Sequence, residues 1–87
     1  EVTPPATIET VKLAALIYYD GININVDLSS IDDMTDVRIF DISGRMLINK
    51  KVEGKMIHPF SMRIKNEVYI VVVSSAGRSV SRKVLVY

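Results

Sequence analysis

Residues that could carry out acid–base or nucleophilic chemistry are few in this chain. It holds one histidine, His58, and no cysteine. A catalytic histidine needs a nucleophile within hydrogen-bond reach and a third group that orients it. Ser43 and Ser61 are the nearest candidates, but Ser43 lies in a Ser-Gly-Arg turn and no G-x-S-x-G elbow occurs. We therefore predict that the chain is not an enzyme and that His58 is a solvated or packing residue.

Carboxylates gather in one polar segment, residues 29–36. Asp32, Asp33 and Asp36 lie there, and Asp27 comes just before. Ca²⁺ takes six to eight oxygen ligands, yet the spacing matches no D-x-D-x-D-G loop. Two interpretations stay open, a calcium site over Asp32–Asp36 or a solvated loop whose aspartates cap turns. The second is favoured, and we expect no cofactor.

Basic residues form two groups, one near a predicted hairpin end and one along the last strand: Lys50, Lys51 and Lys55, then Arg78, Arg82 and Lys83. They could bind an anionic partner such as a lipid head group or an acidic glycan. They could also protect edge strands against pairing with other sheets, which the pattern favours. Because 11 basic residues face 10 acidic ones, the formal charge is only +1, and we expect no nucleic-acid partner.

The composition predicts a β-sheet core within one small domain. Of 87 residues, 48% are hydrophobic. Val and Ile dominate the apolar set, and β-branched side chains favour the pleated surface of a sheet. The longest apolar run, Val68 to Val73, is strand-sized, so no membrane span is expected.

We predict a linker over residues 1–7, which contain Pro4-Pro5, and one domain over residues 8–87. The alternation in residues 8–19 favours a strand that ends at the Asp20-Gly21 turn. A helix over Val11–Tyr19 remains the alternative, because this stretch also contains good helix formers. The chain does not begin with Met, so we expect a piece of a larger protein.

Clear alternation follows the Asp20-Gly21 turn. Ile22, Ile24, Val26 and Leu28 are predicted on one buried face, and the asparagines between them on a wet face. Further strands are predicted at residues 37–42, 45–52, 56–64, 68–75 and 78–87. Pro59 makes the 56–64 segment an edge strand, and the 68–75 strand is expected to be central and covered on both faces.

These segments predict an all-β fold, an antiparallel immunoglobulin-like β-sandwich of about seven strands, because turn signals recur at sandwich-like spacing. Most consecutive strands are expected to pair as hairpins, since the connections are short.

The most distinctive turn joins residues 37–42 to residues 45–52. Gly44 supplies the positive φ that a tight turn needs, and the side chain of Asp41 or Ser43 can bond the turn backbone next to Arg45. Phe40 with Ile42 on the first arm and Met46 with Ile48 on the second are predicted to form one apolar face.

The segment from Val37 to Leu47 resembles the V-x-I-[YF]-D-x-x-G-[RK]-x-[LV] hairpin of type IX secretion C-terminal sorting domains. Val68-Tyr69-Ile70-Val71-Val72-Val73 is similar to the V-Y-[IV]-V-x-V strand of that family. A short turn and a last strand with Arg82-Lys83-Val84-Leu85-Val86 follow in the same order. The resemblance covers about residues 22–87.

This resemblance implies a recognition function without an active site. Such domains lie behind an upstream cargo domain, are bound by a secretion translocon, and are removed by a sortase-like peptidase. The protein would then be secreted, on the outer-membrane surface, or in the periplasm in transit. An immunoglobulin-like spacer or adhesion module of a multidomain surface protein is the alternative.

The last strand is the recognition segment that we expect, since an exposed strand can add to the sheet of a partner. Its predicted recognition residues are Arg78, Arg82, Lys83, Val84, Val86 and Tyr87.

Overall fold

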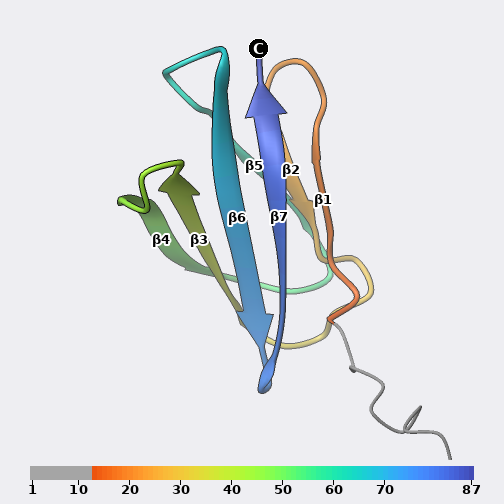
Figure 1. Cartoon of the computed structure of the whole chain (residues 1–87). Helices are drawn as coiled ribbons and strands as arrows, with labels where there is room; N and C mark the ends of the chain where they lie inside the picture. The colour runs from red at the N-terminus through yellow and green to blue at the C-terminus, as the bar shows by residue number, and fades with distance from the viewer. Residues whose placement is uncertain (1–12) are drawn as a thin grey trace, which may run out of the picture.

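Two facing β-sheets make up residues 13–87, the part of the chain that the computed structural model describes (Figure 1). The strands are β1 (Leu16–Tyr19), β2 (Ile24–Asp27), β3 (Thr35–Asp41), β4 (Met46–Val52), β5 (Ile57–Phe60), β6 (Glu67–Ser75) and β7 (Arg78–Val86). All pairs of hydrogen-bonded strands are antiparallel. The predicted all-β sandwich of seven strands is confirmed. None of the described segments is a helix with the length and hydropathy of a membrane span.

The strand order separates the chain into a three-stranded sheet, β1-β2-β5, and a four-stranded sheet, β4-β3-β6-β7. Only β1–β2, β3–β4 and β6–β7 are hairpins between consecutive strands. The other three connections cross from one sheet to the other, so the expectation that most consecutive strands pair was too broad. Short connections allow this because facing sheets lie only about 10 Å apart at the ends of the sandwich.

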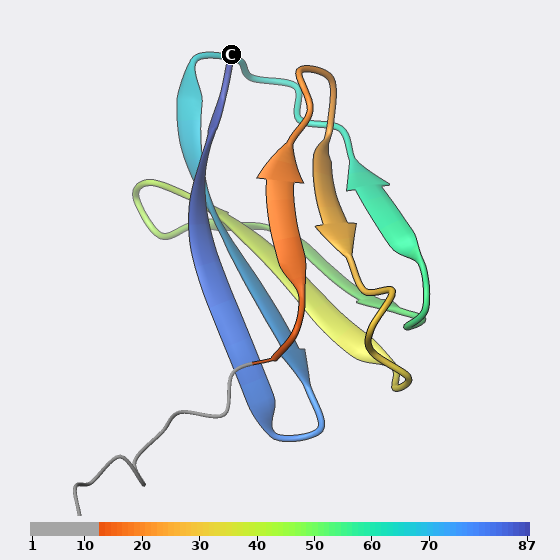
Figure 2. The ribbon, with the colours of Figure 1, turned by 90° about the vertical axis from the view of Figure 1, so that its right-hand side faces the viewer.

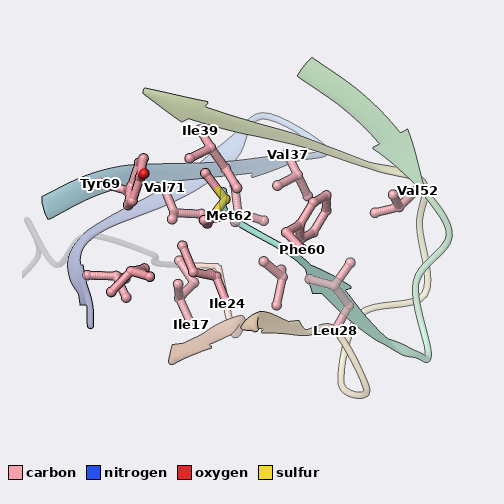
Figure 3. Close-up of a cluster of buried hydrophobic side chains, with 14 of the residues drawn as sticks. Ile17, Ile24, Leu28, Val37, Ile39, Val52, Phe60, Met62, Tyr69 and Val71 are labelled. Carbon is pink, nitrogen blue, oxygen red and sulfur yellow. The ribbon is translucent and has the colours of Figure 1, made fainter. Parts of the chain in front are cut away.

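The core lies between the sheets, where apolar side chains from both layers meet (Figure 3). Strand β6 supplies Tyr69, Val71 and Val73 to this core, and the facing sheet supplies side chains such as Ile24 and Phe60. The alternate residues of β6 are half-buried on its outer face. The prediction that β6 is central is therefore confirmed. The prediction that both of its faces are covered is wrong, because a two-layer sandwich leaves the outer face of each sheet to solvent.

The first strand is shorter than the sequence pattern indicates. Residues 1–12, which include the predicted linker and the start of the predicted strand, lie outside the described residues. Within the described part, Leu16–Tyr19 is a strand paired with β2, so the helix alternative is wrong for these four residues. Hydrogen bonds across this ladder hold the segment extended.

The alternation after the first turn is confirmed for Ile24, Val26 and Leu28, which are fully buried, but not for Ile22. Ile22 is 70% exposed. The Asp20 carboxylate accepts hydrogen bonds from the backbone N–H groups of Ile22 and Asn23 at 2.8 and 2.7 Å. This cap keeps Ile22 in the turn.

Asn25 was predicted on the wet face of β2 and is instead buried, with 7% exposed. β2 is the central strand of its sheet, and Asn25 pairs with Tyr18 on one side and Pro59 on the other. Its amide donates to the Asp20 carboxylate at 2.8 Å, which satisfies the buried polar group. Pro59 lies on β5, which is an edge strand as predicted.

A β-bulge interrupts the ladder between β3 and β4. Ile39 faces Ile48 and Phe40 faces Met46, so Leu47 is the extra residue. Since Ile39 is buried and its neighbour Phe40 lies on the outer face, Met46 and Ile48 fall on opposite faces. The predicted common apolar face is therefore wrong, because the extra residue reverses the alternation.

Gly54 lies where the β4–β5 connection passes against the β2–β3 loop. The Lys55 N–H donates to the carbonyls of Leu28 and Ile31 at 2.9 and 2.8 Å. A Cβ at Gly54 would overlap the carbonyl oxygen of Ile31 and come within 2.9 Å of that of Asp33. Both obstacles are backbone atoms, which cannot move aside as a flexible side chain can.

We expect Gly54→Ala to lower the free energy of unfolding by about 3 kcal/mol or more, because the methyl group displaces backbone. Gly44→Ala should cost only about 1 kcal/mol, since a Cβ there meets nothing within 4 Å and only its φ of +94° is unfavourable. Urea unfolding followed by circular dichroism measures both. Equal losses for the two variants would contradict this account.

Candidate recognition surface on the last strand

The predicted recognition residues lie on β7, an edge strand of the four-stranded sheet. Val84 and Val86 are opposite Tyr69 and Glu67 and point into the core, where both are buried. They can offer a partner only their backbone. The exposed side chains of this segment are those of Arg78, Ser79, Ser81, Arg82, Lys83, Leu85 and Tyr87.

Strand β1 of the other sheet runs beside β7 and contacts it (Figure 2). A depression of about 290 Å³ lies along this junction, lined by Tyr18, Tyr19, Arg82, Lys83, Val84, Leu85 and Tyr87. A partner strand that paired with β7 would have to enter between β7 and β1. A partner at this surface would therefore meet side chains first, whereas strand addition would require β1 to move.

Tyr19 joins β1 to the end of β7. Its hydroxyl donates to the carbonyl oxygen of Tyr87 at 2.6 Å. The two rings meet edge to face, with centroids 5.2 Å apart and planes at 75°. This contact spans 68 positions of sequence, and it holds Tyr87 in place although its side chain is largely exposed.

Sequence reasoning did not include Tyr18 and Tyr19 in the recognition surface. A signal was available, because two consecutive aromatic residues on a strand must point to opposite faces. Tyr19 turns toward the core and toward Tyr87, while Tyr18 stays on the exposed side of β1. Which strand lies next to this pair is decided only by tertiary packing.

The charge of this surface is positive. Arg78, Arg82 and Lys83 form no ion pair within residues 13–87. Together with the tyrosine rings, Arg82 and Lys83 offer hydrogen-bond donors and cations beside apolar area. Such a surface can bind carboxylate or phosphate groups that are attached to an apolar partner.

The predicted turn motif is closed by Asp41. One carboxylate oxygen, Oδ1, accepts from the Ser43 N–H at 3.0 Å, the Ser43 hydroxyl at 2.7 Å and the Arg45 N–H at 2.9 Å. The other, Oδ2, accepts from Arg45 Nε at 3.1 Å. Gly44 has a φ of +94°. The predicted need for glycine is confirmed, and of the two side chains considered Asp41 is the acceptor.

These bonds all favour the charged form of Asp41. The Ser43 hydroxyl, followed by the Arg45 backbone N–H and the Arg45 charge, lowers the pKa of the Asp41 carboxyl below its ordinary value. Both carboxylate oxygens of Asp41 accept hydrogen bonds within the turn, so Asp41 acts as a structural acceptor.

The structure brings the turn and the end of β7 to the same end of the four-stranded sheet. Asp41 pairs with Tyr69 on β6, and Tyr69 pairs with Val84 on β7. Two strand spacings, about 10 Å, separate Asp41 from Val84. The turn is thus near the recognition surface without being part of it.

The aspartates of the acidic segment form ion pairs with two different lysines. Lys55 Nζ lies 2.9 Å from Asp32, and Lys51 Nζ lies 3.9 Å from Asp36. Within residues 13–87 no group of three histidine, aspartate or glutamate side chains could hold a metal ion. Asp27 caps its own turn by accepting from the Ser29 N–H at 2.9 Å. The arrangement favours the turn-capping interpretation over calcium.

The histidine has a backbone partner. His58 Nε2 lies 2.6 Å from the carbonyl oxygen of Glu53, so this nitrogen carries the proton that it donates. The bond ties β5 to the β4–β5 connection, which is a packing role.

Residues 6–86 match a protein family described as a domain of unknown function, DUF8694. The chain belongs to this family. The DUF8694 match includes all seven strands, the Asp41 turn and every predicted recognition residue except Tyr87. No curated protein matches the chain significantly.

Replacing Asp41 by Asn should destabilise the domain near neutral pH and have less effect in acid. A lowered folded-state pKa contributes stability above the unfolded pKa and loses it as the pH falls through the folded pKa. The difference in unfolding free energy between wild type and Asp41→Asn should therefore shrink as the pH falls below about 4. Urea unfolding at several pH values measures it.

Asp33→Asn is the matched control, because the Asp33 carboxylate forms no hydrogen bond or ion pair within the described residues. It should show no comparable pH dependence. A difference for Asp41→Asn that stays constant from neutral to acid pH would contradict the assignment.

Tyr19→Phe keeps the ring and removes the hydroxyl that holds the Tyr87 carbonyl. We expect a loss of about 0.5–1.5 kcal/mol of unfolding free energy. Amide exchange should accelerate at the end of β7 more than at its centre. Tyr18→Phe, whose hydroxyl forms no bond within residues 13–87, is the control. Uniform acceleration along β7, or the same effect from both variants, would show that the hydroxyl bond does not anchor the strand.

Proposed function

We propose that this domain is a non-catalytic C-terminal sorting and export recognition domain of a secreted or cell-surface bacterial protein. One observation carries the proposal. The three segments that resemble type IX sorting domains, residues 37–47, 68–73 and 82–86, lie in contiguous strands of a single sheet, β4-β3-β6-β7. Segments far apart in the sequence thus form one continuous structural unit.

The recognition step uses the side chains at the end of β7. Arg82, Lys83 and Tyr87 are exposed, and the Tyr19 hydroxyl keeps Tyr87 in position. Their partner is a secretion translocon whose docking surface carries acidic groups beside apolar ones. A sortase-like peptidase then separates the domain from its upstream cargo. The protein is in the periplasm during transit and is released or displayed at the outer-membrane surface.

A reporter protein fused in front of residues 1–87, in a cell with a type IX system, tests this proposal. We expect export of the reporter, and a reduction of more than about tenfold when Arg82→Glu and Lys83→Glu are combined. Lys50→Glu with Lys51→Glu changes the net charge equally on β4, which β3 and β6 separate from β7, and should leave export intact. Circular dichroism of each purified variant establishes that it is folded. An absence of export by the unaltered domain would overturn the proposal, and so would equal export by both folded variants.

A second function is favoured by the positions of the two ends of the described chain. Leu13 lies beside Ala76 and Arg78 at the β6–β7 turn, whereas Tyr87 lies at the other end of the sandwich (Figures 1 and 2). A module that is entered at one end and left at the other can stack in a row. An immunoglobulin-like spacer or adhesion module of a surface protein uses this geometry, and failure of the reporter fusion would favour it.

A further inference from the structure

The two edges of the four-stranded sheet are protected differently. β7 lies beside β1, while no described strand pairs with the outer edge of β4. Lys50 on β4 is opposite the buried Val37, so its charge emerges on the core-facing side of the edge. Inward-pointing charge of this kind prevents pairing with a foreign strand. The second half of β4 is thus protected.

The first half of β4, Met46–Ile48, has no such protection. It carries no charged residue, and Met46 and Leu47 are 49% and 41% exposed. The bulge leaves Leu47 without a cross-strand partner on β3. An unpaired, apolar strand edge is the kind of edge that accepts another strand.

An apolar groove adjoins this half-strand. It measures about 270 Å³ and is lined by Leu47, Ile48, Ser61, Met62, Arg63, Ile64 and Tyr69. Met62 and Tyr69 are buried and project into the space between the sheets (Figure 3). Ile64 is 60% exposed at the mouth, and the Tyr69 hydroxyl donates to the Ile64 carbonyl at 2.7 Å. This hydrogen bond holds in place the side of the groove that Ile64 and Tyr69 form.

The groove has one charged residue, Arg63, and Arg63 forms no ion pair within residues 13–87. Burial, with the charges of Glu67 and Asp41, raises the pKa of Tyr69, which keeps its hydroxyl protonated as the donor to Ile64. Asp41 itself is paired with Arg45. Arg63 is thus the charged residue among those that line the groove, with Lys50 further along β4, while the Glu67 carboxylate lies outside the lining but close enough to act on the Tyr69 hydroxyl.

A second copy of this chain does not suit the groove. In a two-fold dimer the same surface meets itself. Two concave grooves leave each other empty, and the Arg63 and Lys50 cations of both copies would come together. An extended segment of another protein avoids both problems, because it supplies a protruding side chain and can supply a carboxylate.

We propose that the first half of β4 and this groove bind an extended acidic segment of a partner protein. The segment pairs its backbone with Met46–Ile48, places an aliphatic side chain in the groove and places a carboxylate on Arg63. This site lies on the opposite edge of the sheet from β7 and is independent of the proposed export function.

A nuclear magnetic resonance titration of the ¹⁵N-labelled domain, residues 1–87, tests the site. The probes are acetyl-Glu-Leu-Glu-Leu-Glu-amide and its counterpart with lysine in place of glutamate. We expect the acidic peptide to shift the backbone amide signals of residues 46–48 and 61–64. The lysine peptide should bind at least about tenfold more weakly.

Two variants and one control sharpen the test. Leu47→Asp should abolish binding of the acidic peptide, and Arg63→Glu should reverse the preference between the two peptides. Ile22→Asp changes an exposed apolar residue in the β1–β2 turn, away from the groove, and should bind like wild type. Each variant is used only if its amide spectrum shows the native fold.

Equal binding of both peptides, shifts confined to β7, or no shifts would each overturn the proposal. Sedimentation that shows wild-type dimers, with the dimer lost in Leu47→Asp, would instead assign the edge to self-association. Retained export by Leu47→Asp in the reporter fusion would separate this site from the recognition surface on β7.

Discussion

The alternation of side chains along β6 is the constraint on which the rest of the structure depends. This strand pairs with β3 on one side and with β7 on the other. Because successive side chains of a strand point to opposite faces, the burial of Tyr69, Val71 and Val73 also decides which neighbouring residues point inward. A slip of one residue would send Val84 and Val86 to solvent and bring Lys83 into the core.

The same constraint determines what the domain can present to a partner. With one face of each sheet used for the core, recognition is limited to outer faces, strand edges and turns. The two edges of the larger sheet then differ in kind. β7 is flanked by β1 and offers cations and tyrosine rings, whereas the bulge at Leu47 leaves β4 with an apolar half beside a groove. One sheet therefore carries two surfaces of different chemistry.

Features that depend on local geometry could be predicted from the sequence. Gly44 and Asp41 form the expected turn because its bonds join residues within four positions of each other. Pro59 marks an edge strand because proline has no N–H to donate. The failures have a common cause. Ile22 is held in a turn by Asp20, Asn25 is covered by a strand from elsewhere in the chain, and the Leu47 bulge depends on which residues of β3 and β4 face each other.

The amino-acid sequence by itself determined the strands, the main turns and the apolar core, because periodicity and turn residues act over a few positions. Only the tertiary structure decided which surfaces are available. Val84 and Val86 point into the core because they pair with Tyr69 and Glu67 of β6, Tyr19 reaches Tyr87 because β1 lies beside β7, and Arg63 lines a groove because the chain after β5 passes beside β4. These contacts join residues distant in sequence, and their partners are selected by the closure of the whole sandwich.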